Sequence, residues 1–255
     1  MNQMTVQDVA RELRADIIEM IYMAQDGHPG PSFSAVDIIA ALYFGGVLDI
    51  DPNHPCWAER DRFVLSKGHA CPALYAALAR RGYFPKEELK TLRAIDSRLQ
   101  GHPDMKKTPG IDAVTGALGN GLSMGLGLAI GLSKQGLKSK VYALVGDGEF
   151  QEGVIWETLM AAAHHRAGNL IVLMDHNGYQ SGGTLDEVSG LNPILPKVEA
   201  FGWHCSEADG HHHEQILQRI SEAQKDPRPS FILCRTQKGR GLPFMEGDNS
   251  WHKKV

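Results

Sequence analysis

Short apolar segments that alternate with helical segments are the feature that most constrains the fold of this chain. Four segments have the continuous apolar character of buried strands: 62–66, 140–145, 169–174 and 231–236. Apolar residues recur at helical spacing between or beside them, at 5–26, 34–44, 121–132, 154–165 and 214–223. Strands that alternate with helices and are bounded by glycine predict an α/β fold, in which a parallel sheet carries helices on both faces.

The length and composition fit one folded domain. The 255 residues are 42% hydrophobic and 22% charged, which provides for a substantial core and argues against general disorder. No internal repeat and no linker-like segment divides the chain, so we expect a single domain over residues 1–255. The formal net charge of −4 argues against binding to nucleic acid or to a membrane surface.

Three further features predict a cytoplasmic protein. The N-terminal segment 1–16 is polar and lacks the apolar stretch of a secretory signal. The longest uncharged stretch, 113–134, contains Asn120, Ser123 and several glycines, so it predicts a buried helix rather than a membrane span. The four cysteines have neither C-x-x-C nor zinc-site spacing, and we expect them to be reduced thiols.

Polar residues follow two of the predicted strands, at the sheet edge where ligands bind in parallel sheets. Asp147 lies in the turn 146–149 after one strand, and Asn177 lies after the next. A helix joins these strands, so we expect them to be neighbours and the two side chains to lie close together. Their oxygens suit a hard cation such as Mg²⁺ or Ca²⁺, completed by diphosphate oxygens, with the N–H of Gly148 donating to a phosphate. Taken alone, the turn is equally well explained as a tight strand-to-helix connection.

The spacing of these residues resembles the signature of thiamine-diphosphate enzymes, in which Gly-Asp-Gly and Asn are separated by 28 intervening residues. The resemblance implies that Asp147, Asn177 and the main-chain carbonyl of Tyr179 hold Mg²⁺, with Ca²⁺ or Mn²⁺ as substitutes, beside bound thiamine diphosphate. Further segments are similar in sequence, order and interval to transketolases, one branch of these enzymes: 27–31, 61–70, 101–104 and 115–121. The similarity extends to His252 and implies the thiamine-diphosphate-binding fold of that family.

The resemblance implies catalytic roles for a set of histidines: His28, His69, His102 and His252. They would line the funnel above the reactive carbon of the cofactor. His69 and His252 would lie nearest the diphosphate, and the other two near the hydroxyls and carbonyl of a ketose donor. Histidine suits this task because its side chain titrates near neutral pH. A hydrogen-bonded structural histidine is the alternative, above all for His252, whose matching segment is short.

The resemblance also implies cofactor contacts for other residues of the matching segments: Gly116, Leu118, Gly146, Gly148 and Glu149. Close helix packing is an alternative explanation for the glycines that follow residue 116. Glu152 and Glu157 correspond to an acidic cluster that, in the family, lies at the dimer interface and links the two active sites. The alternative for this pair is an exposed charged helix face.

Other histidines are given no functional role. His211-His212-His213 precedes the predicted helix 214–223 and is expected to be a solvated helix start, because adjacent residues do not converge on one metal ion. The pair at 164–165 is expected at a helix end.

Two segments depart from the family pattern. Residues 181–183 are Ser-Gly-Gly where an apolar-Asp-Gly run is common, so an aliphatic contact to the cofactor ring is absent or supplied elsewhere. Asp175-His176 precedes Asn177 where an acidic or aromatic residue is more usual. Neither departure removes an implied metal ligand.

The resemblance covers only the amino-terminal, diphosphate-binding part of a usual transketolase. It implies a transferase that moves a two-carbon glycolaldehyde unit from a ketose or ketose phosphate to an aldose or aldose phosphate. The domain that holds the aminopyrimidine would be a separate carboxy-terminal partner subunit, in an α2β2 assembly, and this chain would be inactive alone. Alternatives are a 1-deoxyxylulose-5-phosphate synthase-like protein, the alpha subunit of a 2-oxo acid dehydrogenase, and a non-catalytic thiamine-diphosphate-binding subunit.

Overall fold

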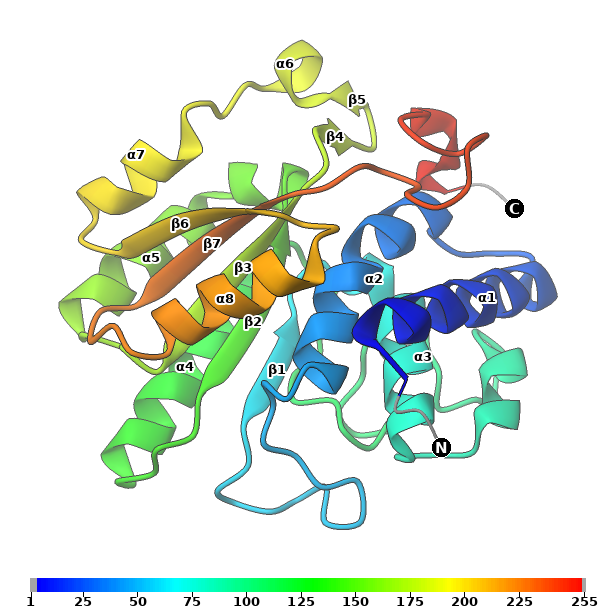
Figure 1. The fold of residues 1–255 in the computed structure, drawn as a ribbon, viewed down its shortest axis with the longest axis horizontal. Coiled ribbons are helices and arrows are strands. Elements are labelled where there is room, and N and C mark those ends of the chain that lie inside the picture. Colours follow the sequence, from blue (N-terminus) through cyan, green and yellow to red (C-terminus); the bar gives the residue numbers. More distant parts are fainter. Residues whose placement is uncertain (1–3, 254–255) are drawn as a thin grey trace.

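The computed structural model describes residues 4–253, and their centre is a five-stranded sheet of strand order β1-β2-β3-β7-β6 (Figure 1). In that order the strands are Arg62–Leu65, Val141–Gly146, Leu170–His176, Ser230–Arg235 and His204–Asp209. Every pairing within this sheet is parallel. The predicted parallel sheet is therefore confirmed, and β2 and β3 are neighbours as expected.

Helices cover both faces of the sheet (Figure 1). One face packs against α1 (Val6–Ala24), α2 (Pro29–Phe44), α3 (Cys71–Arg81) and α8 (His213–Ala223). The other packs against α4 (Asn120–Lys134), α5 (Gly153–His164) and α7 (Ile194–Ala200). Shorter elements complete the fold: η1 (Gly68–Ala70), η2 (Lys86–Thr91), η3 (Gly148–Gln151), α6 (Leu185–Val188), η4 (Asn249–His252) and the hairpin β4 (Tyr179–Gln180) with β5 (Gly183–Thr184).

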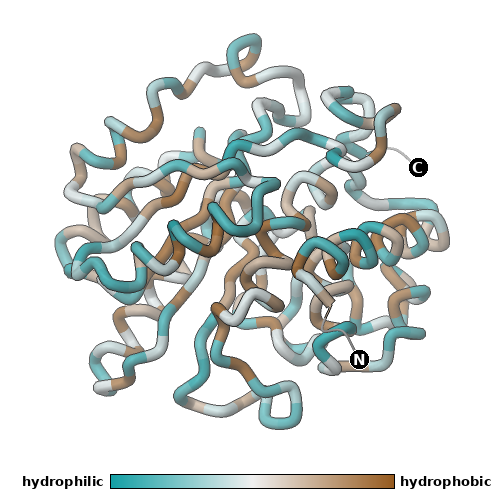
Figure 2. The backbone as a smooth tube through the Cα atoms, in the orientation of Figure 1, coloured by the Kyte–Doolittle hydropathy of each residue, from teal (hydrophilic) through white to brown (hydrophobic). Residues whose placement is uncertain are grey.

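Alternation along the central strands builds a core on each side of the sheet. Tyr142 and Leu144 of β2 pack into the core with α1, α2, α3 and α8, whereas Ala143 and Val145 pack into the core with α4, α5 and α7. All of these side chains are buried, which explains why β2 is apolar at every position instead of at every second one. Figure 2 shows hydrophobic positions concentrated on the central strands and hydrophilic ones on the outer loops.

A capping box begins the first helix, and a proline begins the second. Thr5 and Asp8 form a reciprocal capping box at the start of α1. The helix expected at 34–44 begins at Pro29 instead, five residues earlier than its apolar spacing indicates. Proline suits the first helical position because it lacks the N–H that would have no partner there. His28 is consequently the residue that precedes the first turn of α2.

Three α-helices or strands of more than four residues had no sequence prediction. β6 is a half-exposed edge strand of mixed polarity, so it lacks an apolar run. α3 follows η1 directly, without a turn signal to separate it from the strand motif before it. α7 is short, and it begins after Pro193.

The remaining expectations for the chain concern membranes and thiols. No helix within residues 4–253 has both the length and the apolar character needed to cross a membrane. The glycine-rich uncharged stretch forms α4, which packs against the sheet as predicted. All four cysteines are unpaired.

Candidate active site

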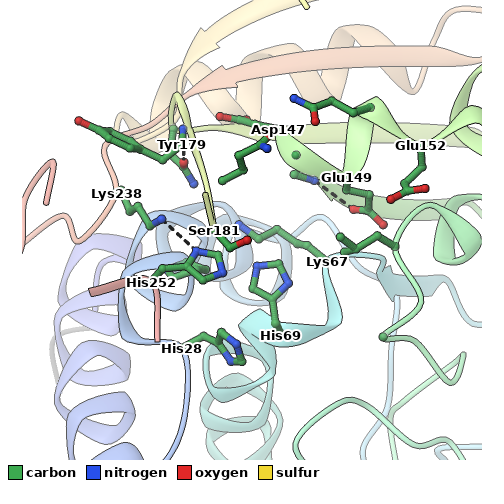
Figure 3. Close-up of a pocket in the computed structure, with 18 of the residues that line it drawn as sticks. His28, Lys67, His69, Asp147, Glu149, Glu152, Tyr179, Ser181, Lys238 and His252 are labelled. Atoms are coloured by element: carbon green, nitrogen blue, oxygen red, sulfur yellow. Dashed lines mark hydrogen bonds between the residues drawn. The ribbon is translucent and has the colours of Figure 1, made fainter. Parts of the chain in front are cut away.

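A cavity of about 380 Å³ lies beyond the carboxyl ends of the first three strands of the sheet. Among the site residues expected from the sequence, its wall contains these: His28, His69, His102, Gly116, Leu118, Gly146, Asp147, Gly148, Glu149, Glu152, Asn177, Tyr179 and His252. Glu157 is the exception, since it is exposed on α5 and does not line the cavity. Figure 3 shows His28, His69 and His252 together, with Asp147 across the cavity from them.

The ends of β2 and β3 bring Asp147 and Asn177 together. Gly146 pairs with Asp175 in the sheet, so the next residues of both strands leave it at the same level. The Asp147 carboxylate accepts a hydrogen bond from the N–H of Gly178, the residue after Asn177. Burial raises the pKa of Asp147, and the hydrogen bond from His176, 3.3 Å away, opposes that shift.

This group of oxygens fits a hard divalent cation. The Asn177 amide oxygen accepts from the N–H of Tyr179 at 3.1 Å, and its amide nitrogen donates to Ser34 at 3.2 Å, which fixes the direction of the side chain. A cation near the buried Asp147 would offset the cost of burying its charge. Residues 4–253 contain no cluster of three or more His, Cys, Asp or Glu side chains that could bind a metal. A metal here would therefore depend on amide, carbonyl and cofactor oxygens besides one carboxylate.

Two glycines around this turn have a structural requirement. Gly119 has φ +83°, in the left-handed region that favours glycine. A Cβ at Gly148 would lie 2.8 Å from the Cβ of Gln180, which is closer than real carbon contacts. Gly119 is thus required by its backbone conformation, the packing explanation holds for Gly121, where a Cβ would lie 2.5 Å from Ser66, and Gly148 permits the close approach of backbone that a phosphate site needs.

Glu149 holds separate parts of the cavity wall in place. Its carboxylate is buried and accepts from the Ser66 hydroxyl, from the N–H of Gly119 at 2.8 Å and from the N–H of Gly146 at 3.1 Å. Burial raises its pKa, and these hydrogen bonds act in the opposite direction. The carboxylate thus joins the ends of β1 and β2 to the segment before α4.

The histidines of the cavity form a neutral cluster. The ring centroids of His28, His69 and His252 lie 5.3–5.6 Å apart. Burial lowers the pKa of His28 to about 4 and that of His252 to about 3, and it lowers the pKa of His69 as well. His102 is shifted in the same direction, again chiefly by burial. At neutral pH these imidazoles are uncharged, so each offers both a donor and an acceptor nitrogen.

Two lysines that the sequence analysis did not assign also line the cavity. Lys67 forms a buried ion pair with Asp175, which also accepts hydrogen bonds from the hydroxyls of Ser34, at 2.6 Å, and Thr236. Lys238 donates to Nδ1 of His252 at 3.0 Å, and burial, assisted by the charge of Lys67, lowers its pKa to about 8. Lys67 stands in the transketolase-like segment 61–70, and Lys238 follows the last strand of the chain. The rule that ligands bind after strand ends could have identified both.

The segment that departs from the family pattern also reaches the cavity. Ser181 lines it, together with Gln180, from the β4–β5 hairpin. Leu118 is the lining residue with a sizeable aliphatic side chain, and 37% of it is exposed. An aliphatic contact to a bound ring system is therefore available from Leu118 rather than from the hairpin.

The histidine run before α8 differs from its expectation. His212 does cap the helix, accepting from the N–H of Gln215. His211 and His213 are not solvated, because both lie against the buried carboxylate of Asp37, at 2.6 and 3.2 Å. The other pair, at 164–165, is exposed at the end of α5 as predicted.

Comparison with known proteins agrees with the contents of this cavity. Residues 4–254 match the family described as "Transketolase, thiamine diphosphate binding domain". The chain is 43% identical to 6-deoxy-6-sulfo-D-fructose transketolase subunit SqwG of Clostridium sp. (strain MSTE9), over 98% of its own length and 91% of that subunit. It is 41% identical to one subunit of the apulose-4-phosphate transketolase of Actinobacillus succinogenes, over 90% of this chain and 83% of that one.

Solved structures show the same fold. Transketolase from Leishmania mexicana superposes with a TM-score of 0.95 at 30% identity, over 99% of this chain and 39% of that enzyme. Transketolase from Campylobacter jejuni superposes with a TM-score of 0.93 at 31% identity, over 100% of this chain and 41% of that enzyme. The chain thus spans about two fifths of these transketolases and most of the two subunits. It belongs to the transketolase family, as the thiamine diphosphate binding domain.

Proposed function

We propose that this chain is the cofactor-binding subunit of a thiamine-diphosphate-dependent transketolase, which transfers a two-carbon glycolaldehyde unit from a ketose to an aldose. One observation carries the proposal. A single cavity is lined by residues of all four transketolase-like segments, and it combines the Asp–Asn pair of the thiamine-diphosphate signature with two lysines and a neutral histidine cluster. In our proposal residues 1–255 form a single domain that binds the diphosphate and its metal.

The diphosphate and its metal would be held at the ends of β2 and β3. We assign Asp147, Asn177 and the carbonyl of Tyr179 as ligands of Mg²⁺, with Ca²⁺ or Mn²⁺ as substitutes. Gly146 and Gly148 give the diphosphate access to the backbone, and Lys238 supplies positive charge. The assignment is supported by the burial of the Asp147 carboxylate and the fixed direction of Asn177. Gly116 and Leu118 line the cavity where the rest of the cofactor would lie.

When bound, thiamine diphosphate would supply the carbanion chemistry that transfer of a two-carbon unit needs. The chain's own contribution is to position the sugar and to move protons at its oxygens. His28 and His102 would donate to and accept from the ketose hydroxyls, and Nδ1 of His28 is buried without a protein partner among the described residues. His69 and His252 would contact the diphosphate side, since His252 is hydrogen-bonded to Lys238.

A partner subunit would complete the site. Support comes from the two relatives named as transketolase subunits, which this chain matches over most of their length. The outer side of α4 and α5 exposes Met124 and Met160, and a Cβ at Gly127 would meet no neighbour. Glu152 and Glu157 are exposed on the same part of the chain. We propose that this surface meets a second copy of the chain, within an α2β2 assembly that contains a carboxy-terminal subunit carrying the aminopyrimidine-binding domain.

The substrate would be a ketose with an anionic terminal group. The two relatives are named for a sulfonated and a phosphorylated sugar, and both of these sugars carry such a group. We propose a sugar phosphate or sulfonate donor and an aldose acceptor, handled in the cytoplasm, where the four unpaired cysteines would stay reduced. A synthase of 1-deoxyxylulose 5-phosphate and the alpha subunit of a 2-oxo acid dehydrogenase are less well supported, because the family match is to transketolase.

The test combines binding with turnover. Calorimetric titration with thiamine diphosphate and Mg²⁺ should show binding to the wild type and its loss in Asp147→Ala, whereas Asp96→Ala, at an exposed position, should bind normally. Retained tight binding in Asp147→Ala would overturn the metal assignment. Co-expression with the partner subunit, followed by a screen of ketose donors and aldose acceptors, should yield turnover that the chain alone lacks. Cofactor binding without any turnover in the complex would favour a non-catalytic subunit.

A further inference from the structure

A cluster of charged and imidazole side chains lies outside the cavity, on the buried side of α2. Its centre is Asp37, which is 4% exposed. Arg14 of α1 donates to both carboxylate oxygens of Asp37, at 3.1 and 2.6 Å, and His211 and His213 lie against the same carboxylate. None of these side chains lines the cavity.

The hydrogen bonds of His211 fix its tautomer. Nε2 accepts from the backbone N–H of Gln237 at 2.8 Å, so the ring proton must be on Nδ1, which donates to Asp37 at 2.6 Å. The imidazole therefore connects a buried carboxylate to the backbone of the segment that follows β7. The Asp37 contact favours the Nδ1–H tautomer, and only in that tautomer can Nε2 accept from the Gln237 N–H.

Arg14 makes a second backbone contact with the same segment. Its Nε donates to the carbonyl oxygen of Arg240 at 2.9 Å, while its terminal nitrogens hold Asp37. The cluster thus makes hydrogen bonds to the backbone of residues 237 and 240, on either side of Lys238. His213 differs in this respect, since the structure shows no hydrogen bond from it to residues 236–241.

The side chain of Lys238 extends from the segment 237–240 into the cavity. Its side chain is 1% exposed and packs against Gly30 at the start of α2, where a Cβ would lie 3.2 Å from two of its carbons. Its ammonium reaches Asn249 and His252, so the position of His252 depends on it (Figure 3). Its aliphatic stem is almost fully buried and packs against Gly30, so a shift of the backbone at residue 238 would move the ammonium with it.

We propose that Arg14, Asp37 and His211 are positioning residues for Lys238, and that they act on the cofactor site through the backbone of residues 237–240. The inference rests on the proposed function in one respect, namely that Lys238 faces the diphosphate. The cluster itself touches neither the cavity nor its contents. Loss of the hydrogen bonds from His211 and Arg14 to residues 237 and 240 leaves the cavity wall intact. It lets the Lys238 ammonium occupy several positions, which weakens binding of the diphosphate.

The His211 position offers a pair of variants that separate its two hydrogen bonds. His211→Asn keeps an N–H near Nδ1 that can reach Asp37 and loses the acceptor for Gln237. His211→Gln places an amide oxygen near Nε2, which restores that acceptor. We expect the dissociation constant of thiamine diphosphate, titrated with Mg²⁺ into the complex of chain and partner subunit, to rise about tenfold in His211→Asn and by about threefold or less in His211→Gln.

Three controls distinguish positioning from general destabilisation. His213→Asn alters the same carboxylate without touching the segment, so its cofactor affinity should stay within twofold of the wild type even if its Tm falls. In the Lys238→Met background, His211→Asn should cause no further loss of affinity. Hydrogen exchange at the amides of residues 236–241 should speed up in His211→Asn and be restored in His211→Gln, with no cofactor present.

The outcomes are distinct. Equal affinities of wild type and His211→Asn, or equal losses in His211→Asn and His213→Asn, would overturn the inference. Unchanged exchange at residues 236–241 in His211→Asn would overturn it independently of any ligand. Failure of the wild-type complex to bind thiamine diphosphate would instead refute the proposed function, and the exchange measurement would still decide whether the cluster orders this segment.

Discussion

Replacement of Glu149 tests whether one buried carboxylate holds the walls of the cavity together. One oxygen accepts from the Ser66 hydroxyl and the N–H of Gly119, and the other accepts from the N–H of Gly146. A glutamine retains one oxygen, so the better of its two orientations loses only the bond to Gly146. A leucine loses all three bonds and leaves two backbone N–H groups without an acceptor.

The expected cost follows from these counts. A buried donor left without a partner costs about 1–3 kcal/mol, so Glu149→Gln should lower the free energy of unfolding by that amount. Burial raises the pKa of Glu149, and the neutral amide relieves part of that desolvation cost, so the lower end of the range is expected. Glu149→Leu should cost about two to three times as much. For a domain of this size, 1 kcal/mol corresponds to a fall in Tm of about 2–4 °C.

Thermal unfolding of the cofactor-free chain measures these differences, with Glu87→Gln on the exposed side of η2 as the matched control. The control should unfold within about 1 °C of the wild type, since surface substitutions away from special contacts change stability little. Affinity for thiamine diphosphate should fall in both Glu149 variants, because the N–H of Gly146 has lost its acceptor in both, and it should fall further in Glu149→Leu, where the N–H of Gly119 has lost its acceptor as well. A wild-type Tm in Glu149→Leu would refute the idea that this carboxylate joins the walls.

Other expectations concern single side chains of the cavity. The pKa of His28 is lowered from 6.5 to about 4 in the folded chain, so the unfolded chain takes up a proton first and stability falls as the pH drops through this window. At pH 5 this contribution is about 1 kcal/mol after allowance for partial exposure, and chemical denaturation at pH 7 and pH 5 should show a smaller loss in His28→Asn. Lys238→Met should raise the dissociation constant of thiamine diphosphate about tenfold or more, as for a lost charge-assisted hydrogen bond; an unchanged constant in calorimetry would exclude a role in binding. Gly148→Ala forces a contact with Gln180 and should lower both Tm and cofactor affinity. The double variant Gly148→Ala/Gln180→Gly should recover both. Gly153→Ala, where a Cβ meets nothing, should leave both unchanged.

Patterns local in the chain were enough to predict the sheet and the Asp147–Asn177 pair. Continuous apolar runs identified four strands, and one joining helix made β2 and β3 neighbours, as the register of Gly146 with Asp175 shows. Parallel neighbours end at the same edge, so the two polar residues after them had to meet. The histidines came from resemblance to a family, because nothing in their own spacing places His28 beside His252.

Contacts between distant segments account for what the sequence did not predict. Lys67 and Asp175 are separated by 108 positions, and His211 lies 174 positions after Asp37. Neither pairing leaves a periodic or local signal. The histidine run before α8 was therefore interpreted from its immediate neighbours, as a solvated helix start, although two of its rings are directed at a carboxylate on another helix. Buried polar networks of this kind become visible only when the packing of the helices is known.

The charges in the cavity wall suit a divalent cation bound together with an anion better than they suit the cation alone or the anion alone. Lys67 is matched by Asp175, and Asp147 is a buried carboxylate that a cation would stabilise. Lys238 has no carboxylate within ion-pair distance among residues 4–253, and its lowered pKa shows that its charge is costly where it lies. A metal alone would add to the repulsion on Lys238, and a diphosphate alone would face Asp147. A metal diphosphate bound as we propose would bring a cation to the carboxylate and negative oxygens to the ammonium, and would thus stabilise both groups.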